Sequence, residues 1–229
     1  MARSVCVIPS RAGTKNKGLW YLNGKCLVEW ALKAAGDRQT IVATDQDYAV
    51  SLASTYSAEV FWRDATLADG DHMIETLVAV ADKFELVDDT IMHVCQPSSP
   101  FLRAQDLRTV EEVFSRRDYW SSVQTVIPIP HNFHEFNQRE FGSRGIAFVH
   151  RGQRLIAKTK QDKPSRWAFG NLVSVLVGKL RRQKQIFAIP SYGEVISRWY
   201  GLDVDDLDDL KLAEAYLAQG LVTEKELRA

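Results

Sequence analysis

The first half of the chain alternates short apolar runs with amphipathic segments. Val5–Ile8 is a β-branched apolar run that ends at Pro9, a pattern typical of a buried strand. Leu27–Ala35 then carries apolar residues at helical spacing. The alternation continues through strands expected at Thr40–Thr44, Val60–Trp62, Thr90–Cys95 and Ser122–Ile127, and helices expected at Tyr48–Tyr56, Met73–Phe84 and Asp106–Phe114. Such alternation indicates βαβ units, so we expect an α/β, Rossmann-like fold with a mostly parallel sheet and helices on both faces.

The alternation stops after Ile127. Residues 128–163 are polar with scattered aromatic side chains, and they predict no helix and only a short strand-like piece at Ala147–His150. Regular patterns then return, with strands expected at Leu172–Val177, Ile186–Ile189 and Tyr200–Asp205, and helices at Leu207–Leu217 and Glu224–Leu227. We therefore expect residues 1–229 to form a single domain. Residues 128–163 are an irregular excursion that covers the active edge of the sheet or reaches a partner subunit.

Composition narrows the classes of function. The 29 basic and 29 acidic side chains give a formal net charge of zero, which argues against a nucleic-acid or membrane-surface binder. Three cysteines stand singly inside apolar runs, which is typical of buried thiols in a reducing compartment. The chain opens without a signal-peptide pattern, and its apolar runs are too short to span a bilayer. We expect a cytoplasmic protein.

A basic, glycine-containing loop follows the first strand. Ligands of open parallel sheets bind beyond the carboxyl ends of the strands, which makes residues 9–18 a candidate anion site. Glycines let backbone N–H groups approach an anion, and Arg and Lys neutralise phosphate charge. The loop is no Walker A motif, because Leu19 and Trp20 stand where Lys and Ser or Thr are required, and no dinucleotide fingerprint is present. A solvated basic loop is the alternative.

Two carboxylates near the C-terminus form a second candidate site. Residues two apart on an extended strand point to the same side, so Asp203 and Asp205 would converge. A converging pair suits a Mg²⁺ ion that also takes phosphate oxygens. Asp205 could instead cap the following helix, but that explanation does not cover Asp203, which lies inside the expected strand.

Two further positions also follow expected strands. Gln96 opens a loop made rigid by Pro97 and Pro100, and Arg63 directly follows the third strand. An ordinary rigid loop and a surface arginine are the alternatives.

These features together resemble the cytidylyltransferase family of CMP-N-acetylneuraminate synthetases and their relatives for other 2-keto sugar acids. Seven short motifs match in the same order over nearly the whole chain. They are Ile8-Pro9-Ser10-Arg11-Ala12-Gly13-Thr14-Lys15, Leu22-Asn23-Gly24-Lys25, Thr44-Asp45, Gln96-Pro97-Ser98-Ser99-Pro100, Pro130-His131-Asn132, Gln161-Asp162-Lys163-Pro164 and Leu202-Asp203-Val204-Asp205.

The resemblance implies a nucleotidyltransferase fold and an enzyme that moves CMP from CTP to a small acidic acceptor, with release of pyrophosphate. It implies a homodimer, and Mg²⁺ held by Asp203 and Asp205. Gln96 would face the acceptor. Catalytic roles would fall to Arg11, Lys15 and Lys17, which hold the CTP phosphates, and the nucleotide site would comprise Pro9, Ser10, Arg11, Ala12, Gly13, Lys15, Lys17 and Arg63.

Departures from the family pattern keep other acceptors and activities open. The first loop is about three residues shorter, and Gly18 stands where the family has asparagine. The arginine that often precedes Gln161 is absent, so we expect Lys158 and Lys160, with Gln161, to clamp an acidic group, unless they are solvated loop residues. A phosphonate is the alternative acceptor. Other classes are a GT-A-type glycosyltransferase, which also uses an Asp-x-Asp metal site, and a non-catalytic CTP-binding subunit.

Overall fold

A seven-stranded sheet forms the body of the protein. The computed structural model describes residues 3–12, 16–64, 67, 72–116, 119–143 and 145–228. The strand order is β11-β7-β10-β6-β1-β4-β5, and β10 runs antiparallel to its neighbours while the other pairs are parallel. The strands are β1 (Ser4–Ser10), β4 (Thr40–Thr44), β5 (Glu59–Trp62), β6 (Ile91–Val94), β7 (Ser122–Pro128), β10 (Trp167–Leu176) and β11 (Ser191–Val195). The expected α/β, mostly parallel fold is confirmed.

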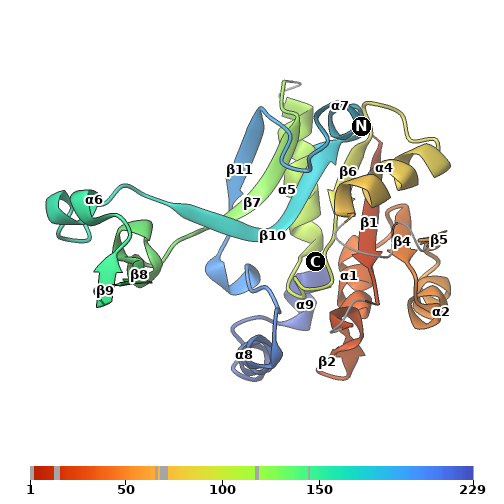
Figure 1. Ribbon diagram of the computed structural model, residues 1–229. Coiled ribbons are helices and arrows are strands. Elements are labelled where there is room, and N and C mark those ends of the chain that lie inside the picture. The colour runs from red at the N-terminus through yellow and green to blue at the C-terminus, as the bar shows by residue number, and fades with distance from the viewer. Residues whose placement is uncertain are drawn as a thin grey trace.

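Helices cover both faces of this sheet (Figure 1). Alternate residues of β1 serve the two faces, since Cys6 and Ile8 belong to one buried cluster and Val5 and Val7 to another. The flanking helices are α1 (Leu27–Ala35), α2 (Asp47–Thr55) and α5 (Ala104–Arg116) on the first side, and α4 (Met73–Lys83) and α7 (Val177–Gln183) on the second. Because β1, β4 and β6 are buried on both faces, they read as continuous apolar runs in the sequence.

A third cluster joins an early hairpin to the C-terminal helices. The hairpin consists of β2 (Tyr21–Leu22) and β3 (Lys25–Cys26), and the helices are α8 (Leu207–Ala218) and α9 (Glu224–Arg228). Leu22, Trp30, Phe101 and Val204 are among the buried members of this cluster. The C-terminal segment is thereby anchored beside the first loop. None of the described helices combines the length and apolar character needed to cross a membrane.

Two expected strands near the C-terminus are wrong. Ile186–Ile189 pairs with no strand in the described part of the chain; β11 begins later, at Ser191, where the chain runs parallel to β7 from Ser122. As the edge of the sheet, β11 needs no continuous apolar run, which hid it in the sequence. Tyr200–Asp205 is also not a strand: Tyr200 ends the 3₁₀ turn η4 (Arg198–Tyr200), and residues 201–205 form a link that pairs with no described strand.

The excursion after β7 forms an arm that projects away from the body (Figure 1). It contains the turns η2 (His131–Phe133) and η3 (Glu135–Asn137), the hairpin β8 (Arg139–Gly142) and β9 (Gly145–Phe148), and the helix α6 (Arg151–Ile156). The expectation of no helix in residues 128–163 is therefore wrong, because α6 is a short, mostly exposed helix without a clear apolar stripe. Within one chain the arm does not cover the edge of the sheet at β1 and β4.

Candidate active site

The loop after β1 is held by the residue that follows β4. Ser10 and Thr44 are aligned at the ends of these parallel strands, so the segments that follow them are neighbours. The Ala12 N–H group donates a hydrogen bond to Asp45 Oδ1 at 2.8 Å. The neighbouring Thr44-Asp45 motif thus acts through its carboxylate, a role that the motif alone did not reveal.

The shortened loop turns tightly against the end of β1. Asn16 adopts the left-handed conformation, with φ of 41°, and opens the 3₁₀ turn η1 (Lys17–Leu19). A side chain at Gly18 would place Cβ 2.7 Å from Ser10 Oγ and 3.0 Å from Val28 Cγ2. Only glycine fits there without displacing its neighbours, which accounts for the departure from asparagine at this position.

Arg63 is buried at the same edge, with 5% of its surface exposed, so the surface-arginine alternative is wrong. Its backbone N–H donates to the Thr44 carbonyl, and its Nη2 donates to the Leu67 carbonyl. Burial lowers the pKa of the guanidinium, the negative charge of Asp45 opposes that shift, and Arg11 adds to it. The site therefore gathers Arg11, Asp45 and Arg63 beyond three adjacent strands.

Unpaired polar atoms concentrate here. Among the described residues, the buried side-chain atoms without a hydrogen-bond partner include Ser10 Oγ, Asn16 Oδ1, Arg63 Nε and both amide atoms of Gln46. Each unmade bond to a buried polar group costs about 1–3 kcal/mol. Ser10 ends β1, and Gln46 and Arg63 follow β4 and β5; the three strands lie side by side. Their concentration marks this edge as a region that keeps hydrogen-bonding capacity for function.

The acidic pair lies on an extended link that docks beside β6. The Val204 N–H donates to the Ser98 carbonyl at 2.7 Å, and Val204 is fully buried while Asp203 and Asp205 on either side of it are exposed. The alternation expected for an extended segment is present, although no strand pairs with it. Lys17 Nζ lies 2.5 Å from Asp205 Oδ1. The first loop and the acidic pair, 188 residues apart in sequence, therefore meet.

Partial removal of water raises the pKa of Asp203. The nearby charge of Asp205 raises it further, whereas a hydrogen bond from Ser98 and the charge of Lys17 lower it. Two carboxylates this close disfavour each other's charge, and a cation between them relieves the repulsion. No group of three or more His, Cys, Asp or Glu side chains in the described ranges could hold a metal ion. Two carboxylates nevertheless fit Mg²⁺, which is usually held by one or two of them together with substrate phosphates.

The helix-cap explanation for Asp205 is wrong, because Asp206 caps α8. The Asp206 side chain accepts hydrogen bonds from the N–H groups of Asp208 and Asp209. In return, Asp209 Oδ2 accepts from the N–H groups of Asp205 and Asp206, completing a capping box. The carboxylate of Asp205 is left outside the cap and reaches Lys17 instead.

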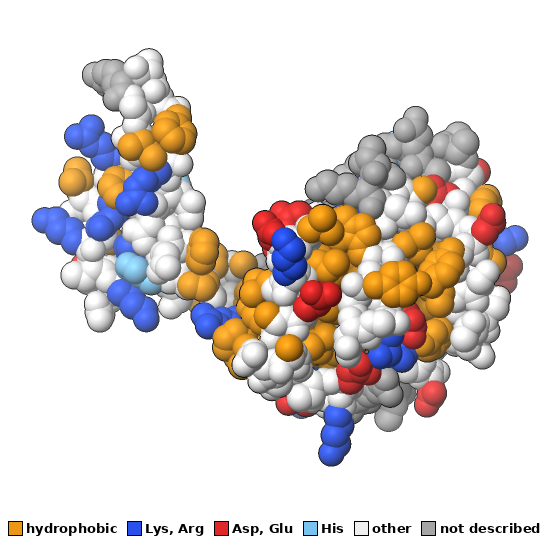
Figure 2. Space-filling view, turned by 90° about the horizontal axis from the view of Figure 1, so that it is seen from below, with side chains coloured by type: hydrophobic (Ala, Val, Ile, Leu, Met, Phe, Trp, Pro, Cys, Tyr) orange, Lys and Arg blue, Asp and Glu red, His pale blue; other side chains and the backbone are white. Residues whose placement is uncertain are grey.

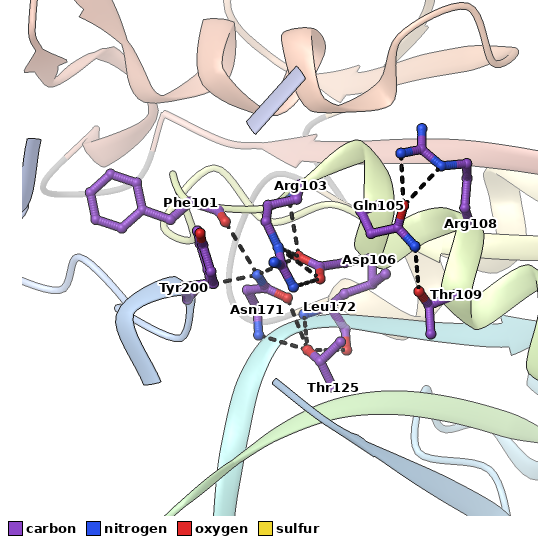
Figure 3. A network of polar contacts seen from close by, with 10 residues as sticks. All are labelled: Phe101, Arg103, Gln105, Asp106, Arg108, Thr109, Thr125, Asn171, Leu172 and Tyr200. Atoms are coloured by element: carbon purple, nitrogen blue, oxygen red, sulfur yellow. Dashed lines mark hydrogen bonds and ion pairs between the residues drawn. The ribbon is translucent and has the colours of Figure 1, made fainter. Parts of the chain in front are cut away.

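Asn171 connects the acidic segment to the rest of the site (Figure 3). Its buried Nδ2 faces the carbonyls of Phe101 and Tyr200 and Asp106 Oδ2, at 3.1–3.3 Å. Its Oδ1 accepts a hydrogen bond from Thr125 Oγ1 at 2.9 Å. One amide thus joins the loop after β6, β7, β10 and the turn that leads to Asp203. No motif of the sequence predicted this role for Asn171.

Two glycines permit this close assembly. A Cβ at Gly170 would lie 2.6 Å from Thr125 Oγ1, and one at Gly201 would lie 2.7 Å from Ile127 Cγ2. Arg103 adds to the support, because its Nη2 lies 2.5 Å from Asp106 Oδ1 and its guanidinium stacks 4.0 Å from the centre of the Tyr200 ring. The loop that begins at Gln96 is therefore rigid as well as proline-rich. Gln96 itself is half-buried, and its carbonyl accepts from the Ser99 N–H.

The structure gathers some of the expected site residues and separates others. Pro9, Ser10, Arg11, Ala12, Lys17, Arg63 and Gln96 follow or end strands at one edge, and Asp205 meets them through Lys17. Gly13 and Lys15 lie outside the described residues. Lys158, Lys160 and Gln161 are exposed on the arm, just after α6 and away from the body of their own chain. Within one chain these three do not join the site.

Comparison with known proteins identifies the family of the chain. A sequence model of the family described as cytidylyltransferase matches residues 5–141, more than half of the chain. The chain belongs to the cytidylyltransferase family. The 3-deoxy-manno-octulosonate cytidylyltransferase of Colwellia psychrerythraea (strain 34H) is 31% identical over 125 residues, which cover 52% of this chain and 44% of that enzyme. The match thus spans less than half of the relative's length, and the relative is a nucleotidyltransferase.

Solved structures of other proteins share the fold. A CMP:2-keto-3-deoxy-manno-octonic acid synthetase in complex with CTP superposes with a TM-score of 0.72 at 18% identity, covering 96% of this chain and 100% of that one. A 4-diphosphocytidyl-2C-methyl-D-erythritol synthase from Anaerococcus prevotii gives a TM-score of 0.61 at 10% identity, covering 95% and 96%. The similarity extends beyond residue 141, so it includes the part of the chain that carries the acidic pair.

Proposed function

We propose that this cytidylyltransferase moves CMP from CTP to a 2-keto sugar acid of the sialic or nonulosonic type, with release of pyrophosphate and with Mg²⁺ as cofactor. The observation that carries the proposal is the contact of Lys17 with Asp205. It brings the basic loop and the acidic pair to one edge of the sheet in a member of this family.

The reaction asks the protein for positioning and charge neutralisation. An oxygen of the acceptor attacks the α-phosphorus of CTP, a new P–O bond forms, the bond to pyrophosphate breaks, and the acceptor proton passes to solvent. Arg11, Lys15 and Lys17 hold the phosphates, while Asp203 and Asp205 would hold Mg²⁺. Bound Mg²⁺ would supply positive charge that offsets the charge of the phosphates. Holding the reactants in line contributes much of the rate in such transfers.

Arg63 supports the choice of cytosine as the base. A guanidinium only donates hydrogen bonds, and the O2 and N3 atoms of cytosine only accept them, whereas N3 of uracil carries a proton. Arg63 is buried, and its Nε has no partner in the described part of the chain. A base with a proton at this position, such as uracil at N3, leaves a donor directed there unpaired, at a cost of about 1–3 kcal/mol.

The relatives support the class of acceptor. The names of the Colwellia relative and of the CTP-bound structure specify a 3-deoxy-manno-octulosonate and a 2-keto-3-deoxy-manno-octonic acid. Nonulosonic acids share the 2-keto acid end with these sugars, so that end is the feature we expect Gln96 to face. The free, buried cysteines Cys6, Cys26 and Cys95 are consistent with a cytoplasmic setting for the reaction.

The charge and apolar exposure of the arm support a homodimer. Residues 129–166 contain eight Lys or Arg and three Asp or Glu, a net charge of +5, so the remainder of the chain carries −5. Figure 2 shows Lys and Arg side chains gathered on the arm. Phe141 and Ile156 are 90% and 84% exposed at its surface. A second copy offers a body of opposite charge, and there Lys158, Lys160 and Gln161 reach the partner's acceptor.

A screen of acceptors with CTP and Mg²⁺, read as pyrophosphate release and as CMP-conjugate by mass spectrometry, tests this function. We expect turnover with a 2-keto sugar acid and none with a neutral sugar. Turnover only with a phosphonate would replace the acceptor class. Consumption of a CMP-sugar without pyrophosphate would indicate a glycosyltransferase, and binding of CTP without any product would indicate a non-catalytic subunit.

A further inference from the structure

The ion pair between Lys17 and Asp205 joins two groups that the proposed reaction uses separately. Lys17 is expected to bind phosphate, and Asp205 is expected to bind the metal, yet their side chains lie 2.5 Å apart. The charge of Lys17 also acts on Asp203, where it opposes the repulsion from Asp205. The ammonium group of Lys17 is therefore placed to balance charge on both carboxylates.

Both backbones that carry this pair are fixed. On the acidic side, Val204 is buried and bonded to Ser98, and Asp209 accepts from the N–H of Asp205. On the basic side, Gly18 packs against Ser10. The side chains are freer, since those of Lys17 and Asp205 are 31% and 71% exposed. The four-carbon stem of lysine can therefore change partners without movement of the loop or of α8.

We propose that Lys17 is a stand-in counter-ion: it neutralises the acidic pair in the free protein, and a divalent cation displaces it from Asp205 toward the phosphates of the bound nucleotide. The inference rests on the proposed function and assigns Lys17 a positioning role in addition to phosphate binding. While Lys17 occupies Asp205, the acidic pair is a weak site for metal alone. Nucleotide phosphates give Lys17 another partner, so the metal and the nucleotide each favour binding of the other.

Binding of Mn²⁺ in the absence of nucleotide, measured by electron paramagnetic resonance of the free ion, tests this role apart from catalysis. We expect Lys17→Met to tighten Mn²⁺ binding about fivefold, the change that corresponds to losing a competing surface ion pair of about 1 kcal/mol. Lys17→Arg should keep the affinity of the wild type, because arginine restores the pair. Lys25→Met is the matched control, since Lys25 makes an ion pair with Glu224 elsewhere and the variant loses the same charge.

A double-variant cycle separates displacement from a general effect of charge. Asp205→Asn should weaken Mn²⁺ binding, and adding Lys17→Met to it should change the affinity less than twofold. Equal or weaker binding by Lys17→Met, the same tightening in Lys25→Met, or no measurable binding by any variant would overturn the inference. Thermal melts check that each variant is folded. Failure of the proposed function would appear separately, as absent pyrophosphate release in the wild type.

Discussion

The edge of the sheet and the projecting arm use apolar residues in opposite ways. In the body, β1, β4 and β6 are buried on both faces, and the loops that follow them present polar side chains. On the arm, Phe141 and Ile156 face solvent, and the hairpin β8–β9 is mostly exposed. A body of this kind can position a site by itself. Exposed apolar side chains gathered on one segment are typical of a surface that contacts another protein.

Loss of the carboxylate of Asp203 or Asp205, in the body, should have the largest effect on activity. We expect Asp203→Asn and Asp205→Asn each to lower pyrophosphate release about 100-fold or more, because charge at the α-phosphate is no longer neutralised. Melting temperatures should stay near that of the wild type, since both side chains are exposed. Assays over a range of Mg²⁺ concentrations, and after chelation with EDTA, provide the measurement.

Asp206 is the matched control for these variants. Asp206→Asn should be silent in both assays, because asparagine caps a helix about as well as aspartate. Asp206→Ala should cost about 1 kcal/mol of stability while activity per folded molecule is kept. Full activity of Asp205→Asn at low Mg²⁺ would remove Asp205 from the site.

Asn171 connects the acidic segment to the rest of the body, and its loss should have the next largest effect. Asn171→Leu leaves Thr125 Oγ1 and Asp106 Oδ2 short of a partner, so we expect about 2–3 kcal/mol of destabilisation in urea. Thr125→Val, which removes one member of the same network, should cost less. An Asn171→Leu variant as stable as the wild type would show that this hydrogen-bond network does not stabilise the fold.

The sequence supported the body much better than the arm, and the reason is physical. Because β1 and β4 are buried on both faces, they appear in the sequence as apolar runs, and the ends of these runs predict the positions of the first loop and of Asp45. The burial of Arg63 and the joining role of Asn171 depend on carbonyls from segments distant in sequence, which no local pattern records. The helix α6 and the edge strand β11 bury too little surface to show periodicity.

Replacing the exposed apolar residues of the arm should have a smaller effect on turnover and should test the arm apart from the body. We expect the double variant Phe141→Ser, Ile156→Ser to sediment as a monomer in analytical ultracentrifugation. Its turnover should fall about tenfold, equivalent to about 1.4 kcal/mol. Its melting temperature should stay near that of the wild type, because the body is unchanged. Lys158→Met with Lys160→Met should keep the dimer and raise KM for the acceptor. A wild-type protein that sediments as a monomer would contradict this arrangement.

The smallest expected effect is acid weakening of the body through His93, which lies on β6 with no exposed surface. Its Nδ1 lies 2.7 Å from Ser174 Oγ, and its Nε2 lies 3.2 Å from Glu111 Oε1. Arg38 already neutralises Glu111 through two contacts, so the ion pair with histidine adds little, and burial lowers the pKa of His93.

A neutral buried histidine stabilises the fold above its unfolded pKa of about 6.5, and this stability is lost as pH falls below that value, because the unfolded chain takes up the proton first. The loss should be at most about 1.4 kcal/mol per pH unit. The pKa of Glu111 is also lowered, against its own burial, by hydrogen bonds from His93, Arg38 and Ser4, so its contribution to stability is lost only at lower pH, below about 4.5.

Urea unfolding at pH 7.5, 6.5 and 5.5 should therefore show a steeper decline in the free energy of unfolding for the wild type than for His93→Gln, whose amide hydrogen-bonds without titrating. Parallel declines for the two proteins would assign the acid sensitivity to other groups.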